Sequence, residues 1–484
     1  MPAQSSGWPR LFAIAACVSV AFTGCASFHP EPLSPTINAA ALDSRTLDDP
    51  QLQRFLLASK SADWTAEPRW DLDTLTLAAL YYHPDLPIAR AKLVAAQADI
   101  VTAHQRPNPT LSLGGAYNTM AVAGAFPPAA LPLTIGPIVS FLIETAGKRE
   151  DRTEQVRHLA DAARADLATA AWQVRGRVRT ALLNLWAARQ RRKLAQAQVA
   201  LRQKLVALLE QRLSAGFATS LDITRERVAL AQATLGIRDV DRVEADGLVQ
   251  LATAIGIPVR ALDGVPFSEG DFEHPATPSQ DLAVGPLRRL ALTGRSDVEA
   301  SLAQYEAAQS ALKLQVANQY PNVTLGPGYN YDVGMNRFIL GPSFDLPIFN
   351  QNQGQIARAL ADRQQAAANF TALQAQVIGA IDAADRAYRT ATQALATADA
   401  LFFDERSRQR QVKASFTAGE SDRPTLVAAE LESTLIQSAQ FDAVVSQRQA
   451  LGALEDALQQ PLLNRTAAPF ISPAGSQTST EASP

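Results

Sequence analysis

A large apolar residue or proline recurs at every second position of the stretch Phe338-Ile339-Leu340-Gly341-Pro342-Ser343-Phe344-Asp345-Leu346. In an extended chain, one face would carry Phe338, Leu340, Pro342, Phe344 and Leu346. Alternation of this kind is typical of a β-strand with two different faces. The preceding residues 332–336 have the composition of a turn. The sequence therefore predicts a β-hairpin over residues 322–346.

A second hairpin is predicted earlier in the chain. Alternate positions after the break Arg106-Pro107-Asn108-Pro109 hold Leu111, Leu113, Gly115 and Tyr117. Its loop, near residues 119–133, is longer and contains Pro127-Pro128. Each hairpin follows a helical segment, about 72–105 and 287–318, that ends at a proline. The two halves thus present the same elements in the same order.

A long helical run follows each hairpin. In the first run, apolar residues step by four and three, at Val174, Val178, Ala181, Leu185 and Ala188. The second run nearly repeats this pattern, with Leu373, Val377, Ala380, Ala384, Tyr388, Ala391, Leu395, Ala398 and Phe402. Such a narrow stripe is typical of coiled-coil packing. Residues 148–213 contain no proline, so one helix on the order of 100 Å long is expected.

Glycines end the two long helices and mark an internal duplication. Gly216 and Gly419 are followed by return helices, predicted at about 220–255 and 424–459. A shift of 212 positions also aligns Asp85 with Asp297 and Pro109 with Pro321. We therefore expect a mainly α fold with a small β part, built from a duplicated unit. The expected divisions are a signal peptide at 1–24, an N-terminal segment at 25–70, a first repeat at 71–263, a linker at 264–286, a second repeat at 287–463 and a disordered tail at 464–484.

The predicted strands are about ten residues long, as in outer-membrane β-barrels. A sheet in lipid must close, because lipid cannot satisfy unpaired edge groups. Four strands are too few for a barrel, so the closure has to come from several copies. Three copies would supply a 12-stranded β-barrel continued by a 12-helix α-barrel, which predicts a homotrimer. The alternative is a soluble periplasmic rod that carries two hairpins.

The first 24 residues have the pattern of an export signal, with a short apolar run, Leu11–Phe22, after Arg10. The run ends in Phe22-Thr23-Gly24-Cys25, which resembles the processing box of bacterial lipoproteins. This resemblance implies a lipid on Cys25 and location in the bacterial outer membrane. The alternative is an ordinary signal with an incidental cysteine. No apolar run reaches the 18 residues of a membrane helix, which excludes a polytopic α-helical protein.

Composition excludes several other classes of function. The 484 residues hold 44 Lys and Arg against 47 Asp and Glu, which gives no basic face for nucleic acid. Two cysteines and five scattered histidines build neither a disulfide framework nor a closed zinc site. His83, in Tyr82-His83-Pro84-Asp85, is expected to have a surface or capping role. No catalytic, nucleotide-binding or metal motif is present, so we expect no enzyme activity and no cofactor.

Several motifs together are similar to the outer membrane factor, or TolC-like, family over nearly all of residues 70–460. They are the break at 106–109, the two glycine turns, Gly341-Pro342-Ser343-Phe344-Asp345-Leu346-Pro347-Ile348-Phe349-Asn350 and Gly354-Gln355-Ile356. The segment Ile143-Glu144-Thr145-Ala146-Gly147-Lys148-Arg149 is similar to the cation-efflux, CzcC-like branch. The resemblance implies a passive exit channel of a tripartite efflux system for small molecules or metal ions. Its implied partners are a periplasmic adaptor, an inner-membrane transporter and outer-membrane lipid. Two alternatives are a secretion duct for polypeptides and a coiled-coil lipoprotein without a pore.

The resemblance also implies roles for the two helix turns. They would lie at the periplasmic tips and meet the adaptor through Ala215, Gly216, Phe217, Ala418 and Gly419. Charged residues just beyond them would hold the pore shut, and the candidates are Asp222, Glu420, Asp422 and Arg423. Arg423 is a candidate partner for Asp222. The alternative is that all four are ordinary exposed charges.

Overall fold

The computed structural model describes residues 28–59, 70–117, 133–268, 270–273, 284–332 and 335–462. The predicted signal peptide, Cys25 and the tail at 464–484 lie outside these ranges. The chain divides into two compact units, Met1–Arg45 and Thr46–Pro484. Within the first unit, the described residues contain the helix α2 (Pro35–Asp43), which begins with a proline in its first turn and buries no residue.

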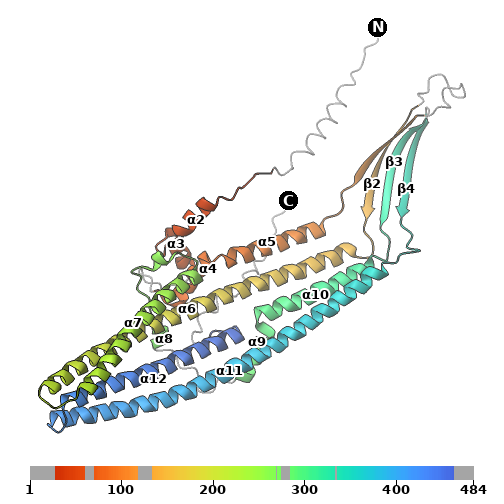
Figure 1. Ribbon diagram of the computed structural model, residues 1–484. Helices are drawn as coiled ribbons and strands as arrows, with labels where there is room; N and C mark the ends of the chain where they lie inside the picture. Colours follow the sequence, from red (N-terminus) through yellow and green to blue (C-terminus); the bar gives the residue numbers. More distant parts are fainter. Residues whose placement is uncertain are drawn as a thin grey trace. The chain divides into compact units, whose positions relative to one another are not determined.

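The second unit contains all the other described elements (Figure 1). Its strands are β1 (Thr110–Tyr117), β2 (Leu133–Ile143), β3 (Val323–Asp332) and β4 (Met335–Phe344). Its helices are α3 (Pro50–Ser59), α4 (Leu72–Tyr82), α5 (Asp85–His104), α6 (Lys148–Ser214), α7 (Ser220–Ile255), the 3-10 turn η2 (Val259–Leu262), α8 (Gly270–Glu273), α9 (Val284–Gly294), α10 (Ser296–Ala317), α11 (Gln353–Thr417) and α12 (Arg423–Leu458). The predicted order of elements is confirmed in both halves, whereas the domain boundaries stay predictions.

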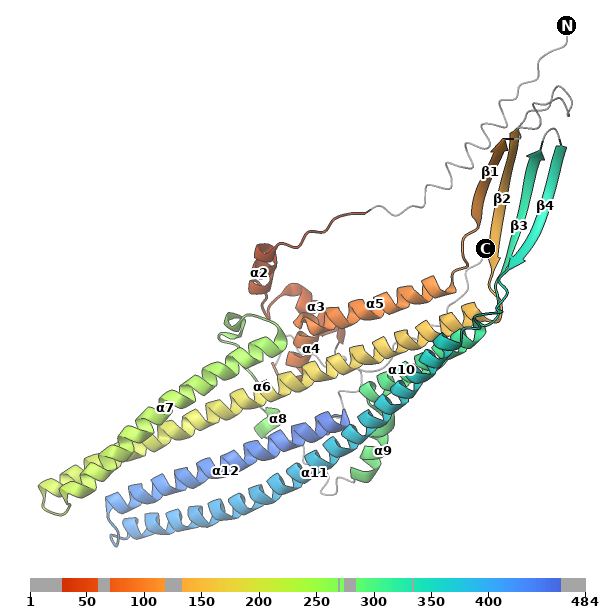
Figure 2. The same cartoon turned by 45° about the vertical axis from the view of Figure 1, so that its right-hand side comes forward.

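The four strands form one antiparallel sheet in the order β1-β2-β3-β4. Thr110 pairs with Ser140, Ile143 with Val323, and Val323 with Phe344. The ends of all four strands that continue into helices therefore lie at the same end of the sheet (Figure 2). Within the described chain β1 pairs only with β2 and β4 only with β3, so both edges of the sheet are open.

The predicted segment 72–105 is divided into α4 and α5 at Tyr82-His83-Pro84. A proline cannot donate a backbone hydrogen bond, which favours a break at this point. His83 is the C-cap of α4, and its backbone N–H donates to the carbonyl of Ala79 at 2.8 Å. The His83 ring is buried, and its Nδ1 accepts from the backbone N–H of Asp85 at 3.2 Å. Of the two roles expected for His83, the structure supports capping and contradicts a surface position.

The core follows the stripe predicted for the first long helix. Val174, Val178 and Leu185 of α6 are at most 1 % exposed and pack with α4 and α7. A smaller cluster joins α9, α11 and α12 around Val377 and Ile381. The prediction for the second long helix is wrong at Ala380, which is exposed while Ile381 is buried instead. The next predicted position, Ala384, is buried, and a residue three or four positions after Val377 can lie on the same face of the helix.

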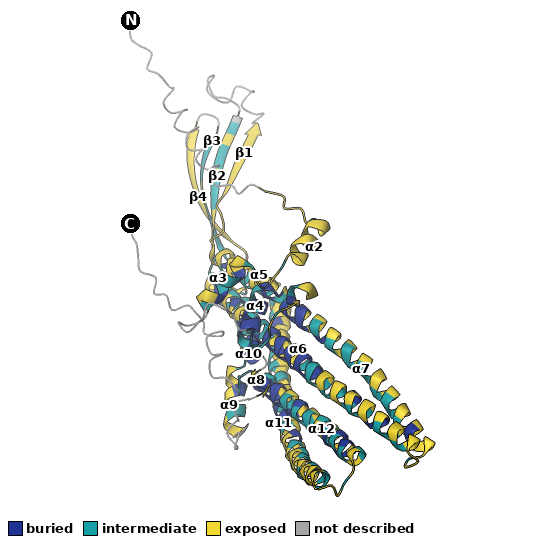
Figure 3. Ribbon diagram, turned by 90° about the vertical axis from the view of Figure 1, so that its left-hand side faces the viewer, coloured by how far each residue is buried: buried dark blue, intermediate teal, exposed yellow. Residues whose placement is uncertain are grey.

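The long helices form two antiparallel pairs, α6 with α7 and α11 with α12, and α12 also packs against α6. Nearer the sheet, α6 contacts α5 and α10, and α10 contacts α11. The turns between the paired helices lie at the end of this unit opposite the sheet (Figure 3). Both turns are largely exposed. Among the described helices, none is long and apolar enough to cross a membrane.

Candidate functional site

The turn from α6 to α7 forms the first helical tip. Gly216 has a φ of 77°, which an L side chain rarely adopts, so a glycine is favoured here. The backbone N–H of Phe217 donates to the carbonyl of Arg212 at 2.8 Å, as in a Schellman ending. The side chain of Phe217 is 75 % exposed. The predicted docking residues 215–217 therefore form an ordered, accessible turn.

Asp222, one of the predicted gate residues, closes a capping box at the start of α7. Its backbone N–H donates to Thr219 Oγ1 at 3.2 Å, and its carboxylate accepts from the backbone N–H of Thr219 at 3.2 Å. The Thr219 hydroxyl also donates to this carboxylate at 2.6 Å. These hydrogen bonds lower the pKa of Asp222, because they favour its charged form. A threonine three residues before an acid was the signal in the sequence that indicates this cap.

The second tip is capped by the same residue types with their positions exchanged, because the acid is now the N-cap and the threonine follows three residues later. Gly419 has a φ of 79°, and Asp422 is the N-cap of α12. The Asp422 carboxylate accepts from the backbone N–H of Thr425 at 3.0 Å and from its hydroxyl at 2.5 Å. Hydrogen bonds from Thr425, followed by the charge of Arg212, lower the pKa of Asp422. Ala418, Gly419, Glu420 and Arg423 are all exposed around this cap.

An ion pair joins the two tips, and it is not the predicted one. Arg212, in the last turn of α6, donates to Asp422 at 2.5 Å. Within the described residues of one copy, Asp222 makes no ion pair with Arg423. In one copy the Asp222 carboxylate is engaged by its own cap, and the pairing with Arg423 stays a prediction for the assembled gate. Sequence reasoning missed Arg212, since no local pattern indicates which acid 210 residues away it will meet.

A buried charge cluster joins α6 to α12 near the middle of the unit. Arg179 donates to Glu455 at 2.6 Å and to Asp456 at 2.5 Å, and Arg175 lies 3.6 Å from Glu455. Burial raises the pKa of Asp456, because it disfavours the charged form. Gly452 leaves room for the guanidinium, since a Cβ there would lie 2.8 Å from Arg179 Nε.

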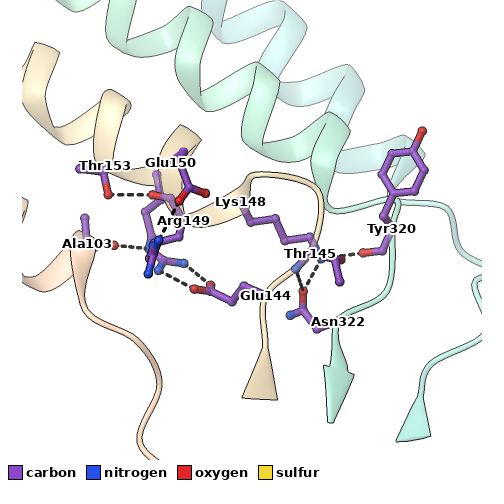
Figure 4. Close-up of polar contacts among 10 residues, drawn as sticks. Ala103, Glu144, Thr145, Lys148, Arg149, Glu150, Thr153, Tyr320 and Asn322 are labelled. Carbon is purple, nitrogen blue, oxygen red and sulfur yellow. Dashed lines mark hydrogen bonds and ion pairs between the residues drawn. The ribbon is translucent and has the colours of Figure 1, made fainter. Parts of the chain in front are cut away.

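The segment 143–149 forms the junction between the sheet and the helices (Figure 4). Ala146 and Gly147 have φ values of 57° and 73°, and this left-handed turn sends the chain from β2 into α6. Lys148 then points back across the junction. Its Nζ donates to the carbonyl of Tyr320 and to Asn322 Oδ1, both at 2.6 Å. Burial lowers the pKa of Lys148.

Neighbouring residues extend this junction to other elements. Thr145 Oγ1 donates to the carbonyl of Pro321 at 2.7 Å. Arg152 donates to Glu144 at 2.6 Å and to the carbonyl of Ala103, at the end of α5, at 3.0 Å. The segment whose sequence is similar to the cation-efflux branch thus binds the connection between α10 and β3, and through Arg152 of α6 it is joined to the end of α5. Sequence reasoning noticed this motif, but could not identify Asn322 as its partner.

In the described ranges, no group of three or more His, Cys, Asp and Glu residues is arranged to hold a metal ion. Burial lowers the pKa of His83, and its Nε2 lies 3.2 Å from Arg177. The site therefore consists of the two tips, the buried cluster and the junction.

Known proteins share both sequence and fold with this chain. Residues 76–257 match the family model described as outer membrane efflux protein. The pyoverdine export outer membrane protein OpmQ of Pseudomonas aeruginosa is 26 % identical over 448 residues, which cover 85 % of this chain and 92 % of that protein. The cobalt-zinc-cadmium resistance protein CzcC of Cupriavidus metallidurans is 28 % identical over 227 residues, or 46 % of this chain and 53 % of that protein.

Solved structures extend the similarity of fold over most of the chain. The outer membrane protein VceC of Vibrio cholerae has a TM-score of 0.64 and 20 % identity, and the alignment covers 81 % of this chain and 96 % of that one. CusC, a protein whose structures are described together with its folding and transmembrane channel formation, has a TM-score of 0.65 and 16 % identity. The alignment covers 90 % of this chain and 100 % of that one. The chain thus resembles outer membrane efflux proteins, in sequence over residues 76–257 and in fold over most of its length.

Proposed function

We propose that this protein is the outer-membrane exit channel of a tripartite efflux system and works as a homotrimer. The open sheet carries this proposal. Both β1 and β4 leave one edge unpaired in the described chain, and both are exposed along their length. Lipid offers no hydrogen bonds to such edges, so a membrane-embedded sheet has to close with other copies.

The long helices support the same closure. Four exposed apolar residues of α7 are spaced by multiples of seven, with Arg242 interrupting the series, and they are Leu221, Val228, Leu235 and Val249. Exposed apolar residues at this spacing indicate that α7 packs against a further helix. The opposite flank, α11, exposes Leu401 and Phe403. We propose that α7 of one copy packs on α11 of the next, so that three copies make a 12-stranded β-barrel and a 12-helix α-barrel.

The tips are the proposed place of adaptor docking and gating. Ala215, Gly216 and Phe217 in one turn, with Ala418 and Gly419 in the other, would contact the periplasmic adaptor. Asp222, Glu420, Asp422 and Arg423 remain the gate candidates, and we add Arg212 because of its ion pair with Asp422. An inner-membrane transporter would supply the energy, since the sequence holds no nucleotide-binding motif.

The proposed cargo is small molecules or metal ions. One relative is named for pyoverdine export and another for cobalt-zinc-cadmium resistance. A conduit needs weak interactions with its cargo, because tight binding would slow release. The selection of cargo would therefore be made by the transporter.

We also propose that Cys25 carries lipid and anchors the mature protein in the outer membrane, with the helices extending into the periplasm. The test is Cys25→Ser. Loss of incorporated radioactive palmitate and retention of the uncleaved signal are expected. Unchanged mass and labelling would contradict the anchor but leave the channel proposal intact.

The channel itself is tested with protein extracted in mild detergent. Native mass should equal three chains, and the protein should give single-channel conductance in planar bilayers. A trimer without conductance would favour a structural coiled-coil lipoprotein. A stable monomer with full β content would overturn the closure on which the proposal depends.

A further inference from the structure

The loop that follows β4 is held in place at both ends, but its apolar side chains are exposed to solvent. Residues 345–350, here named the junction loop, are anchored where Phe344 pairs with Val323 and where Asn352 donates to the carbonyl of Gln315 at 2.8 Å. Inside the loop the backbone N–H of Ile348 donates to the carbonyl of Leu346 at 2.8 Å. The exposed fractions are large at Leu346 (66 %), Ile348 (68 %) and Phe349 (98 %). A fixed segment that displays apolar side chains indicates a partner.

The direction of the strands indicates which partner. The junction loop continues one edge strand, β4, and residues 105–109, here named the proline break, lead into the other edge strand, β1. Both segments lie at the end of the sheet from which the helices start. At this end Thr110, the first residue of β1, pairs with Ser140 near the end of β2. At the same end Ile143 of β2 pairs with Val323 of β3, and Val323 pairs with Phe344, the last residue of β4. Neighbouring strands alternate in direction, so β4 of one copy can pair antiparallel with β1 of the next. That pairing places the junction loop and the proline break of the next copy at the same end of the joined sheet.

The two segments are complementary in chemistry. Arg106 and Asp345 are both exposed, and neither makes an ion pair in the described part of the chain. Pro107 and Pro109 are exposed and offer apolar surface, as Phe349 does. We infer that the junction loop is covered by a second copy of this chain, with Asp345 pairing with Arg106 of that copy and Phe349 packing on its two prolines. This inference rests on the proposed trimer and specifies where its copies touch below the sheet.

Disulfide trapping tests the contact. Arg106→Cys combined with Asp345→Cys should give covalent dimers and trimers on a denaturing gel after mild oxidation. Within one copy the two edges are separated by two strands, about 14 Å, which is beyond the reach of a disulfide. The matched control is Arg106→Cys with Met335→Cys, because Met335 begins β4 about 30 Å further along the strand. The control pair and the parent chain should show no covalent ladder.

Charge reversal provides a second measurement. Arg106→Glu and Asp345→Arg should each reduce the fraction of trimer that survives heating in detergent, and the double variant should restore it. A native trimer with neither a covalent ladder nor restoration would overturn this contact alone. A native monomer would overturn the proposed function. If Phe349→Cys in the trimer reacts with a membrane-soluble maleimide as fast as an exposed strand cysteine, the loop faces lipid and the inference fails.

Discussion

Lys148→Met should loosen the junction between sheet and helices without changing the fold. The Lys148 side chain is buried and donates two hydrogen bonds of 2.6 Å, to Tyr320 O and Asn322 Oδ1. Each charge-assisted hydrogen bond contributes about 1.5–3 kcal/mol. Two effects reduce the sum. Burial of the ammonium already opposes its charge, as its lowered pKa indicates, and Lys148, Tyr320 and Asn322 line a cleft of about 790 Å³ that water can enter.

The remaining loss is about 2–4 kcal/mol for local opening, a factor of roughly 30 to 1,000. Hydrogen exchange of peptides over 144–153 and 318–326, read by mass spectrometry, measures it. The matched control is Arg149→Met, because Arg149 makes a partly exposed ion pair with Glu150 at 2.9 Å and should contribute at most about 1 kcal/mol. Equal exchange in Lys148→Met and Arg149→Met would refute the assignment of the junction's stability to Lys148.

Four further expectations concern the buried cluster and the tips. Arg179→Ala leaves the Glu455 carboxylate, 3 % exposed, without its nearest cation, and should destabilise the α6–α12 contact by about 3–5 kcal/mol in thermal unfolding, whereas the exposed Arg164→Ala should change little. Arg212→Ala breaks the pair with Asp422 and should raise resting conductance in bilayers while stability changes by less than about 1 kcal/mol; conductance equal to the parent would place the gate elsewhere. Replacing Glu420 and Asp422 together should weaken cation preference, measured as a reversal potential in a salt gradient. The pKa of Asp422 is lowered from 3.8, so its cap stabilises α12 fully above pH 3.8 and is lost as the pH falls through the lower pKa of the folded state. Amide hydrogen exchange at residues 423–427 should therefore accelerate only in this low pH range. The variant Asp422→Asn should show no such acceleration.

The sequence by itself determined the elements and their order. Residues 148–213 and 424–459 were predicted as helices, and the structure has Lys148–Ser214 and Arg423–Leu458. The hairpin predicted at 322–346 contains β3 and β4. These features depend on hydrophobic period and on Gly or Pro at their ends, and both act within a few residues of chain.

The candidate site was predictable only where its interactions are local. The turns at Gly216 and Gly419 follow from the positive φ that glycine tolerates, and the Thr219–Asp222 cap follows from a spacing of three residues. The Arg212–Asp422 pair was not predicted, because a charged residue has many possible partners of opposite sign and its own helix cap competes with them.

Only the tertiary structure decided which distant residues meet. Lys148 reaches Asn322 across 174 positions, and Arg179 reaches Glu455 across 276. Such pairs depend on how the helices are placed side by side, which is set by the summed packing of the apolar stripes and not by the charges themselves. A stripe specifies that a helix will pack, whereas the neighbour it packs against is selected by the free energy of the whole fold.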